Sequence, residues 1–169
     1  MGINFSKKYY KNIGIKMNSN KPCFLIIGGQ KCGTNSLYKY LVQHPLIAPS
    51  LQHEIHYFDL NFDKDLKWYQ SQFSELEPGM ITGESSPYYL FHPLVPQRVF
   101  EEYPQMKLIV LLRNPAKRAI SHYYHEVRLG TEYLSLKEAL AIEETRLQGE
   151  ANKIIQTGTY YSFNHQHYT

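Results

Sequence analysis

A glycine-rich stretch near the N-terminus combines backbone freedom with side-chain donors and one cation. It reads Gly28-Gly-Gln-Lys-Cys-Gly-Thr-Asn-Ser36 and follows the continuous apolar run at residues 23–27. Such a run is typical of a strand buried in a parallel sheet, and Leu37, Tyr40 and Leu41 recur afterwards at helical spacing. Backbone N–H groups and the helix dipole converge on an anion at such a junction. The stretch therefore predicts a phosphate-type site, and the alternative is a plain glycine-rich turn.

A second cationic position follows the apolar run at residues 107–112, which ends in Arg113-Asn-Pro. Gly28, Gly33 and Thr34 match the spacing of the Walker A pattern GxxxxGK[ST], but the lysine, Lys31, precedes Gly33. A nucleotide hydrolase would also place an acidic residue at a neighbouring strand end to organise Mg²⁺. Arginine suits a second anionic group instead. The pattern favours a ligand with phosphates at two separated points, and a P-loop kinase or hydrolase is the alternative.

These motifs resemble those of sulfotransferases that use 3′-phosphoadenosine 5′-phosphosulfate (PAPS). Residues 28–37 resemble the family's 5′-phosphosulfate loop, and Leu111-Leu-Arg-Asn-Pro-Ala-Lys-Arg-Ala-Ile-Ser121 resembles its 3′-phosphate motif. Glu54-Ile-His-Tyr-Phe-Asp59 and Gly83-Glu-Ser-Ser-Pro-Tyr88 resemble the carbohydrate branch, which includes the heparan sulfate N- and O-sulfotransferases and bacterial relatives. Two positions depart from the pattern: Asn35 replaces a frequent threonine, and Ser85 replaces a lysine that contributes to the acceptor site of the glucosaminyl 3-O-sulfotransferases.

The resemblance assigns a role to each candidate site residue. It implies that the 5′-phosphosulfate is bound by Lys31, Cys32, Gly33, Thr34, Asn35 and Ser36, and that the 3′-phosphate is clamped by Arg113 and Ser121. Lys31 would stabilise the departing phosphate, Glu54 would act as general base, and His56 would assist or orient it. The other interpretations are a solvated loop lysine at 31, a surface carboxylate at 54 and a helix-face serine at 121. The resemblance implies PAPS without a metal ion.

The implied activity is transfer of a sulfuryl group from PAPS to a hydroxyl or amine of a carbohydrate acceptor. A kinase or hydrolase is one alternative, and a truncated, inactive fragment that binds the product 3′-phosphoadenosine 5′-phosphate (PAP) is another. The fragment hypothesis arises because the family's acceptor-side wall follows the position where this chain stops at Thr169. It predicts exposed apolar surface near Tyr160, Tyr161, Phe163 and Tyr168, since such rings need partners to cover them.

Composition limits the classes of protein to which the chain can belong. Its 169 residues, 43% of them hydrophobic, suit one domain, which we place at residues 22–169 after a flexible leader at 1–21. A formal net charge of +3 lacks the basic excess of nucleic-acid binders. Cys23 and Cys32 have no cluster of metal ligands around them, and no apolar run approaches the ~20 residues that span a bilayer. We expect a cytoplasmic protein.

Alternating strands and helices must position these groups, and they predict an α/β fold with a P-loop-like central parallel sheet flanked by helices, incomplete at its C-terminus. Strands are expected at 23–27, 46–48, 79–83 and 107–112, the last of them at the centre of the sheet. Helices are expected at 34–44, 68–73, 93–103, 114–130 and 135–148. Asn114-Pro115 and the capping box Ser135-Leu-Lys-Glu138 mark the starts of the last two helices.

Overall fold

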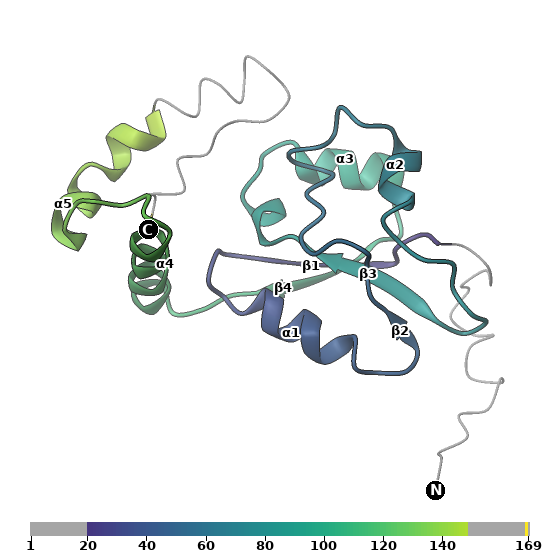
Figure 1. Cartoon of the computed structure of the whole chain (residues 1–169). Helices are drawn as coiled ribbons and strands as arrows, with labels where there is room; N and C mark the ends of the chain where they lie inside the picture. Colours follow the sequence, from purple (N-terminus) through teal and green to yellow (C-terminus); the bar gives the residue numbers. More distant parts are fainter. Residues whose placement is uncertain (1–19, 149–167, 169) are drawn as a thin grey trace, which may run out of the picture.

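A four-stranded parallel sheet forms the centre of the computed structural model, which describes residues 20–148 and Tyr168 (Figure 1). The strand order is β2-β3-β1-β4. The strands are β1 (Phe24–Gly28), β2 (Ile47–Ala48), β3 (Ile81–Ser85) and β4 (Lys107–Leu111). The sheet confirms the predicted α/β class. β1 pairs with β3 on one side and with β4 on the other, and all five of its residues are buried.

Helices cover both faces of this sheet. They are α1 (Thr34–Leu41), α2 (Leu66–Gln70), the 3₁₀ helix η2 (Pro87–Leu90), α3 (Val95–Glu102), α4 (Pro115–Leu129) and α5 (Leu136–Ala141). Figure 1 shows α1 on one face, α2 and α3 on the other, and α4 with α5 beside the sheet. Within the described ranges, no helix combines the length and apolar character needed to cross a membrane.

Alternate residues of β1 supply two separate cores. Leu25 and Ile27 join an aromatic cluster under α2 and α3, whereas Phe24 and Ile26 pack with Tyr38 under α1. This division follows from the two-residue period of a strand, which sends neighbouring side chains to opposite faces. Both faces of the sheet are therefore covered around β1, which fixes the strand that leads into the glycine-rich loop.

The position predicted for strand 107–112 was wrong. In the described part of the sheet β4 pairs with β1 at the edge, and Leu108 and Val110 are 54% and 48% exposed. An apolar run indicates a strand but does not say which strands pair with it, because strand order is set by contacts distant in sequence. The register pairs Gly28 with Leu111, so the glycine-rich loop and the Arg113 segment leave the sheet side by side.

The helix starts marked by caps agree with the sequence, but other ends differ: α1 ends three residues earlier than expected, and α2 spans 66–70 where 68–73 was expected. Asn114 accepts from the Lys117 N–H, and Ser135 and Glu138 form the predicted capping box. β3 begins and ends two residues later than expected, because Gly79, at φ 88°, still belongs to a turn. η2 was not foreseen. A turn at Ile142 separates α5 from a helical segment at 143–148, where one helix was expected.

At Tyr168 the prediction of exposed apolar surface was wrong. Its side chain is completely buried beside Ala119 and Ala139, and its hydroxyl donates to Glu132 at 2.7 Å. Tyr160, Tyr161 and Phe163 lie outside the described residues. A single aromatic residue without helical or strand period carries no signal of its burial partner, so the sequence could not place Tyr168 against α4 and α5.

Candidate functional site

The glycine-rich loop makes a tight turn between β1 and α1. The Cys32 N–H donates to the Gly29 carbonyl at 3.0 Å, and both Lys31 (φ 69°) and Gly33 (φ 96°) have left-handed backbones. Gly33 caps α1 and has no side chain that could accept from the first-turn N–H groups. These N–H groups and the positive end of the helix dipole are therefore available to an anion.

Glycine is required at position 28 by the neighbouring strand. A Cβ atom on Gly28 would lie 2.3 Å from the Leu111 carbonyl oxygen, which is closer than packing permits. A Cβ atom on Gly29 would lie 3.1 Å from both Arg118 Cδ and Cys32 Sγ. The loop thus runs against β4 on one side and against the Arg118 side chain on the other, which restricts its conformation.

Three cationic side chains lie on or against this loop. Lys31 belongs to it, and Arg113 Nη1 donates to the Lys31 carbonyl at 3.2 Å. Arg118, in the first turns of α4, contacts the loop at Gly29 and donates through Nη2 to the Tyr168 carbonyl at 2.8 Å. Arg118 was missing from the sequence prediction, although it lies within the motif that ends at Ser121. Residues three apart share a helix face, so Ser121 lies on the face of α4 that carries Arg118.

The second part of the site is the segment 54–59, which precedes α2. Glu54 (φ 51°) and His56 (φ 53°) both have left-handed backbones, an arrangement that costs on the order of 1–3 kcal/mol for each residue that is not glycine. His56 Nδ1 lies 2.8 Å from Asp59 Oδ2, and its Nε2 lies 3.5 Å from Glu54 Oε2. The imidazole therefore bridges two carboxylates, one of them fully buried.

Charge interactions set the protonation states of His56 and Glu54. Burial disfavours the imidazolium, but the hydrogen bonds to Asp59 and Glu54 outweigh it and raise the pKa of His56 to about 10. For Glu54, burial favours the neutral acid, yet His56, His53 and Lys31 together lower the pKa below its usual value. At neutral pH Glu54 is a carboxylate and His56 a cation. β1 and β3 are parallel neighbours with Ile26 opposite Ser85, and the segment is bound to Glu84 and Ser86, so both parts of the site lie at the carboxyl ends of adjacent strands.

A buried carboxylate that sequence reasoning missed lies behind this segment. Glu84 of β3 accepts from the Ile55 N–H at 3.2 Å and from the hydroxyls of Ser86, Tyr69 and Tyr89 at 2.7, 2.8 and 2.9 Å. Burial raises its pKa, and the hydroxyl hydrogen bonds act against that rise. The sequence signals were its place in the Gly83–Tyr88 motif, to which no role was assigned, and a carboxylate in the otherwise uncharged strand Ile81–Ser85.

The structure brings most of the predicted site residues to the carboxyl end of the sheet. Lys31, Cys32 and Gly33 form the loop, Thr34 is buried at the start of α1, and Asn35 and Ser36 are exposed there. Arg113 contacts the loop, whereas Ser121 is placed only by its helix face. In residues 20–148 and at Tyr168, no group of three or more His, Cys, Asp or Glu side chains is arranged to share a metal ion.

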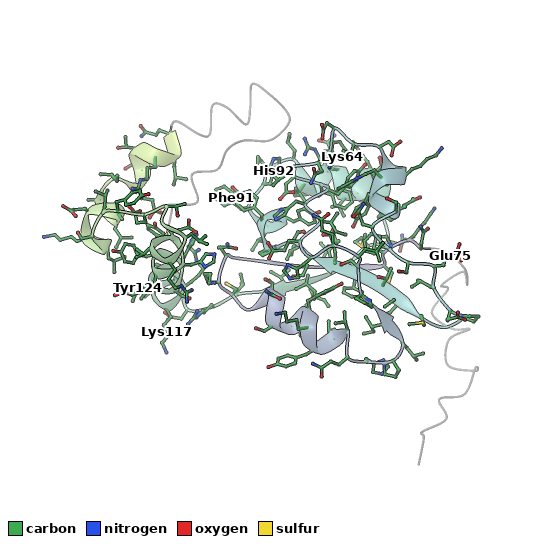
Figure 2. All side chains as sticks on the ribbon, in the orientation of Figure 1. Lys64, Glu75, Phe91, His92, Lys117 and Tyr124 are labelled. Carbon is green, nitrogen blue, oxygen red and sulfur yellow. The ribbon has the colours of Figure 1, made fainter. Side chains whose placement is uncertain are left out.

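Two segments flank this end of the sheet. Figure 2 shows Phe91 and His92, directly after η2, on the side of their layer that is turned toward α4, which carries Lys117 and Tyr124. The Phe91 and Tyr88 rings lie 5.8 Å apart, and Phe91 is 49% exposed. The Phe91 ring therefore offers an exposed apolar surface on the side turned toward α4.

Comparison with known proteins gives one consistent result. The family model described as "Sulfotransferase domain" matches residues 21–165. A sulfotransferase of known structure from Alicyclobacillus acidocaldarius is similar, with 38% sequence identity and a TM-score of 0.69, over 76% of this chain and 59% of that one.

Two curated relatives are similar over shorter stretches. Membrane-associated sulfotransferase kil1 from Dictyostelium discoideum is 36% identical over 110 residues, which are 63% of this chain and 23% of that protein. Human heparan sulfate glucosamine 3-O-sulfotransferase 6 is 40% identical over 102 residues, 60% of this chain and 30% of the relative. The chain therefore matches less than a third of the length of these curated relatives.

Proposed function

The chain belongs to the sulfotransferase domain family, and we propose that it binds PAPS and transfers the sulfuryl group to a hydroxyl or amine of a carbohydrate acceptor. One observation carries the proposal: the glycine-rich loop that follows β1 and the Glu54 segment bound at the end of β3 lie at the carboxyl ends of two adjacent parallel strands. An anion site and a base are thus close together, as in-line transfer from a phosphate to an acceptor requires. The heparan sulfate relatives support a glycan as the acceptor class.

The described residues fit a donor that carries phosphate groups at two points. Glycine at 28 lets the loop lie directly against β4, and the uncapped first turn of α1 offers N–H groups to the 5′-phosphosulfate. Arg113, held at the Lys31 carbonyl, would bind the 3′-phosphate together with Ser121, and Arg118 adds a positive charge nearby. PAPS supplies the activated sulfuryl group in this chemistry.

The chain's own residues would divide the chemical work. Lys31 neutralises the negative charge that develops on the phosphate oxygen as its bond to sulfur breaks. Glu54 accepts the proton of the acceptor hydroxyl or amine while the new bond to sulfur forms. His56 cannot be the base at neutral pH, because its pKa of about 10 keeps it protonated. It instead orients the Glu54 carboxylate, and Asp59 holds the imidazolium in place.

Calorimetric titration of the purified chain with PAP and with ATP, each with and without Mg²⁺, tests the donor. We expect tighter binding of PAP than of ATP and no response to Mg²⁺. A preference for ATP that requires Mg²⁺ would support the kinase or hydrolase alternative. The spacing of Gly28, Gly33 and Thr34 is the observation that favours this alternative. Acceptor-dependent loss of sulfate from PAPS, measured with a panel of glycans, then tests the transfer itself.

Besides the roles of the individual site residues, three expectations stay predictions. They are the domain at residues 22–169 after a leader at 1–21, the cytoplasmic location, and the absence of a metal requirement. The fragment hypothesis also stays open to experiment: a chain that binds PAP but shows no acceptor-dependent desulfation would support it.

A further inference from the structure

The left-handed backbone at Glu54 and His56 persists only if surrounding groups hold it. Three successive N–H groups point into one buried polar cluster. The Ile55 N–H donates to Glu84 Oε2 at 3.2 Å, the His56 N–H to Ser86 Oγ at 3.2 Å, and the Tyr57 N–H to Tyr89 Oη at 2.8 Å. The N–H groups of residues 55–57 are thus bound by Glu84 of β3, by Ser86, which links β3 to η2, and by Tyr89 of η2.

Glu84 fixes the direction of these bonds. Ser86 Oγ donates its proton to Glu84 Oε2 and Tyr89 Oη donates to Glu84 Oε1, at 2.7 and 2.9 Å. A hydroxyl that has given its proton to a carboxylate can only accept from a neighbouring N–H. Glu84 therefore turns both hydroxyls into acceptors for the His56 and Tyr57 N–H groups, in addition to binding the Ile55 N–H itself.

We propose that Glu84 is a positioning residue that, with Ser86 and Tyr89, holds segment 54–57 in the strained conformation that keeps Glu54 against His56, at the end of the sheet that carries the glycine-rich loop. Its kinetic consequence rests on the proposed sulfotransferase function, but its structural consequence does not. Release of these bonds would let the backbone relax out of the left-handed region, and the 3.5 Å contact between His56 Nε2 and Glu54 Oε2 would be lost.

The sequence provides a matched pair of variants. Tyr69 and Tyr89 are both buried, and each donates to Glu84 Oε1, at 2.8 and 2.9 Å. Among the described residues, the Tyr69 hydroxyl binds Glu84 alone, whereas the Tyr89 hydroxyl also accepts from the Tyr57 and Phe58 N–H groups. Each of Tyr69→Phe and Tyr89→Phe therefore removes one hydroxyl hydrogen bond to Glu84 Oε1. Only Tyr89→Phe also removes the acceptor of the Tyr57 and Phe58 N–H groups.

The His56 imidazole reports the outcome without any turnover. Two carboxylates of its own segment, Glu54 and Asp59, raise its pKa. The charged or titratable groups outside the segment that interact with those two carboxylates are Lys31, His53, Glu84, Tyr89, His92 and Arg98. NMR of histidine-labelled chain, with the signal assigned from His56→Gln, follows the titration of this one ring.

We expect Tyr89→Phe to lower the pKa of His56 by about 1 or more toward 6.5, because the ring loses its fixed place between the carboxylates. Ser86→Ala and Glu84→Gln should also lower the pKa of His56. If Glu84→Gln does not fold, Tyr89→Phe and Ser86→Ala still test the proposal. Tyr69→Phe should leave the titration unchanged despite a similar loss of stability. In the transfer assay, Tyr89→Phe should lower kcat about 10-fold and leave PAP affinity unchanged, as misplacement of a base does.

Equal His56 titrations in Tyr69→Phe and Tyr89→Phe would overturn the positioning role. A wild-type chain without transfer activity would count against the proposed function, and the His56 comparison would still decide whether the Glu84 cluster positions the segment.

Discussion

Asp59→Asn should reveal how strongly the buried charge pair supports the candidate site. Asp59 has a fully buried side chain, and its Oδ2 lies 2.8 Å from His56 Nδ1. The hydrogen bonds and negative charges of Asp59 and Glu54 together raise the pKa of His56 from 6.5 to about 10, against the effect of burial. A hydrogen bond between charged groups is worth about 1.5–3 kcal/mol. We therefore expect Asp59→Asn to lower the free energy of unfolding by about 2 kcal/mol at pH 7, and to lower the pKa of His56 by about 1.5.

The pH dependence gives this prediction its sign. The folded-state pKa of His56 is raised, so its contribution to stability is fully present below pH 6.5 and is lost as the pH rises through 10. The difference between wild type and Asp59→Asn should thus shrink to less than about 0.5 kcal/mol at pH 10. Urea unfolding at pH 7 and at pH 10 measures both values.

Asp63→Asn is the matched control, because it makes the same chemical change at an exposed position of the next loop. It should alter stability by no more than about 0.5 kcal/mol at either pH. If Asp59→Asn were equally destabilising at pH 7 and pH 10, the loss would come from packing, and the charge pair would not be its cause.

Four further predictions follow from the site. Lys31→Ala should reduce sulfuryl transfer about 100-fold, as loss of an electrostatic stabiliser does, and near-normal turnover would exclude that role. Arg113→Ala should weaken PAP at least about 10-fold more than adenosine 5′-phosphosulfate, which lacks the 3′-phosphate; equal losses in calorimetry would contradict the assignment. Glu54→Gln should abolish turnover and leave PAP affinity unchanged. A normal rate would show that Glu54 is a surface carboxylate and not the base. Gly28→Ala should lower the free energy of unfolding by about 2 kcal/mol, because its Cβ would meet the Leu111 carbonyl at 2.3 Å, and an unchanged urea midpoint would show that β4 can move aside.

The parts of the site that could be predicted are the local ones. A buried strand, a glycine-rich turn and an amphipathic helix follow one another within residues 23–44. Their order and connection can therefore be predicted from neighbouring residues alone. Asn114 and Ser135 as helix caps were predictable for the same reason, since a cap binds N–H groups two or three residues away. The roles assigned to Lys31, Glu54 and Ser121 came from the resemblance and stay predictions.

The parts that could not be predicted depend on partners distant in sequence. The edge position of β4 follows from pairing with β1, more than 80 residues earlier. Arg118 reaches Gly29 only because α4 begins where β4 leaves the sheet beside the loop. Tyr168 packs against α4 and α5, and nothing in its own neighbourhood marks it as buried.

The two parts of the site are held in place by different means, and this determines how each should respond to mutation. The glycine-rich loop is fixed by backbone fit against β4, and its exposed side chains, Asn35 and Ser36, support no neighbouring element in the described structure. Changes to those side chains should alter ligand affinity with little effect on stability. Segment 54–57 is fixed by buried hydrogen bonds to Glu84, Ser86 and Tyr89, so the side chains that aim the base also contribute to the core. Substitutions there should couple loss of stability to loss of catalytic geometry, which is why Tyr69→Phe is needed to separate the two.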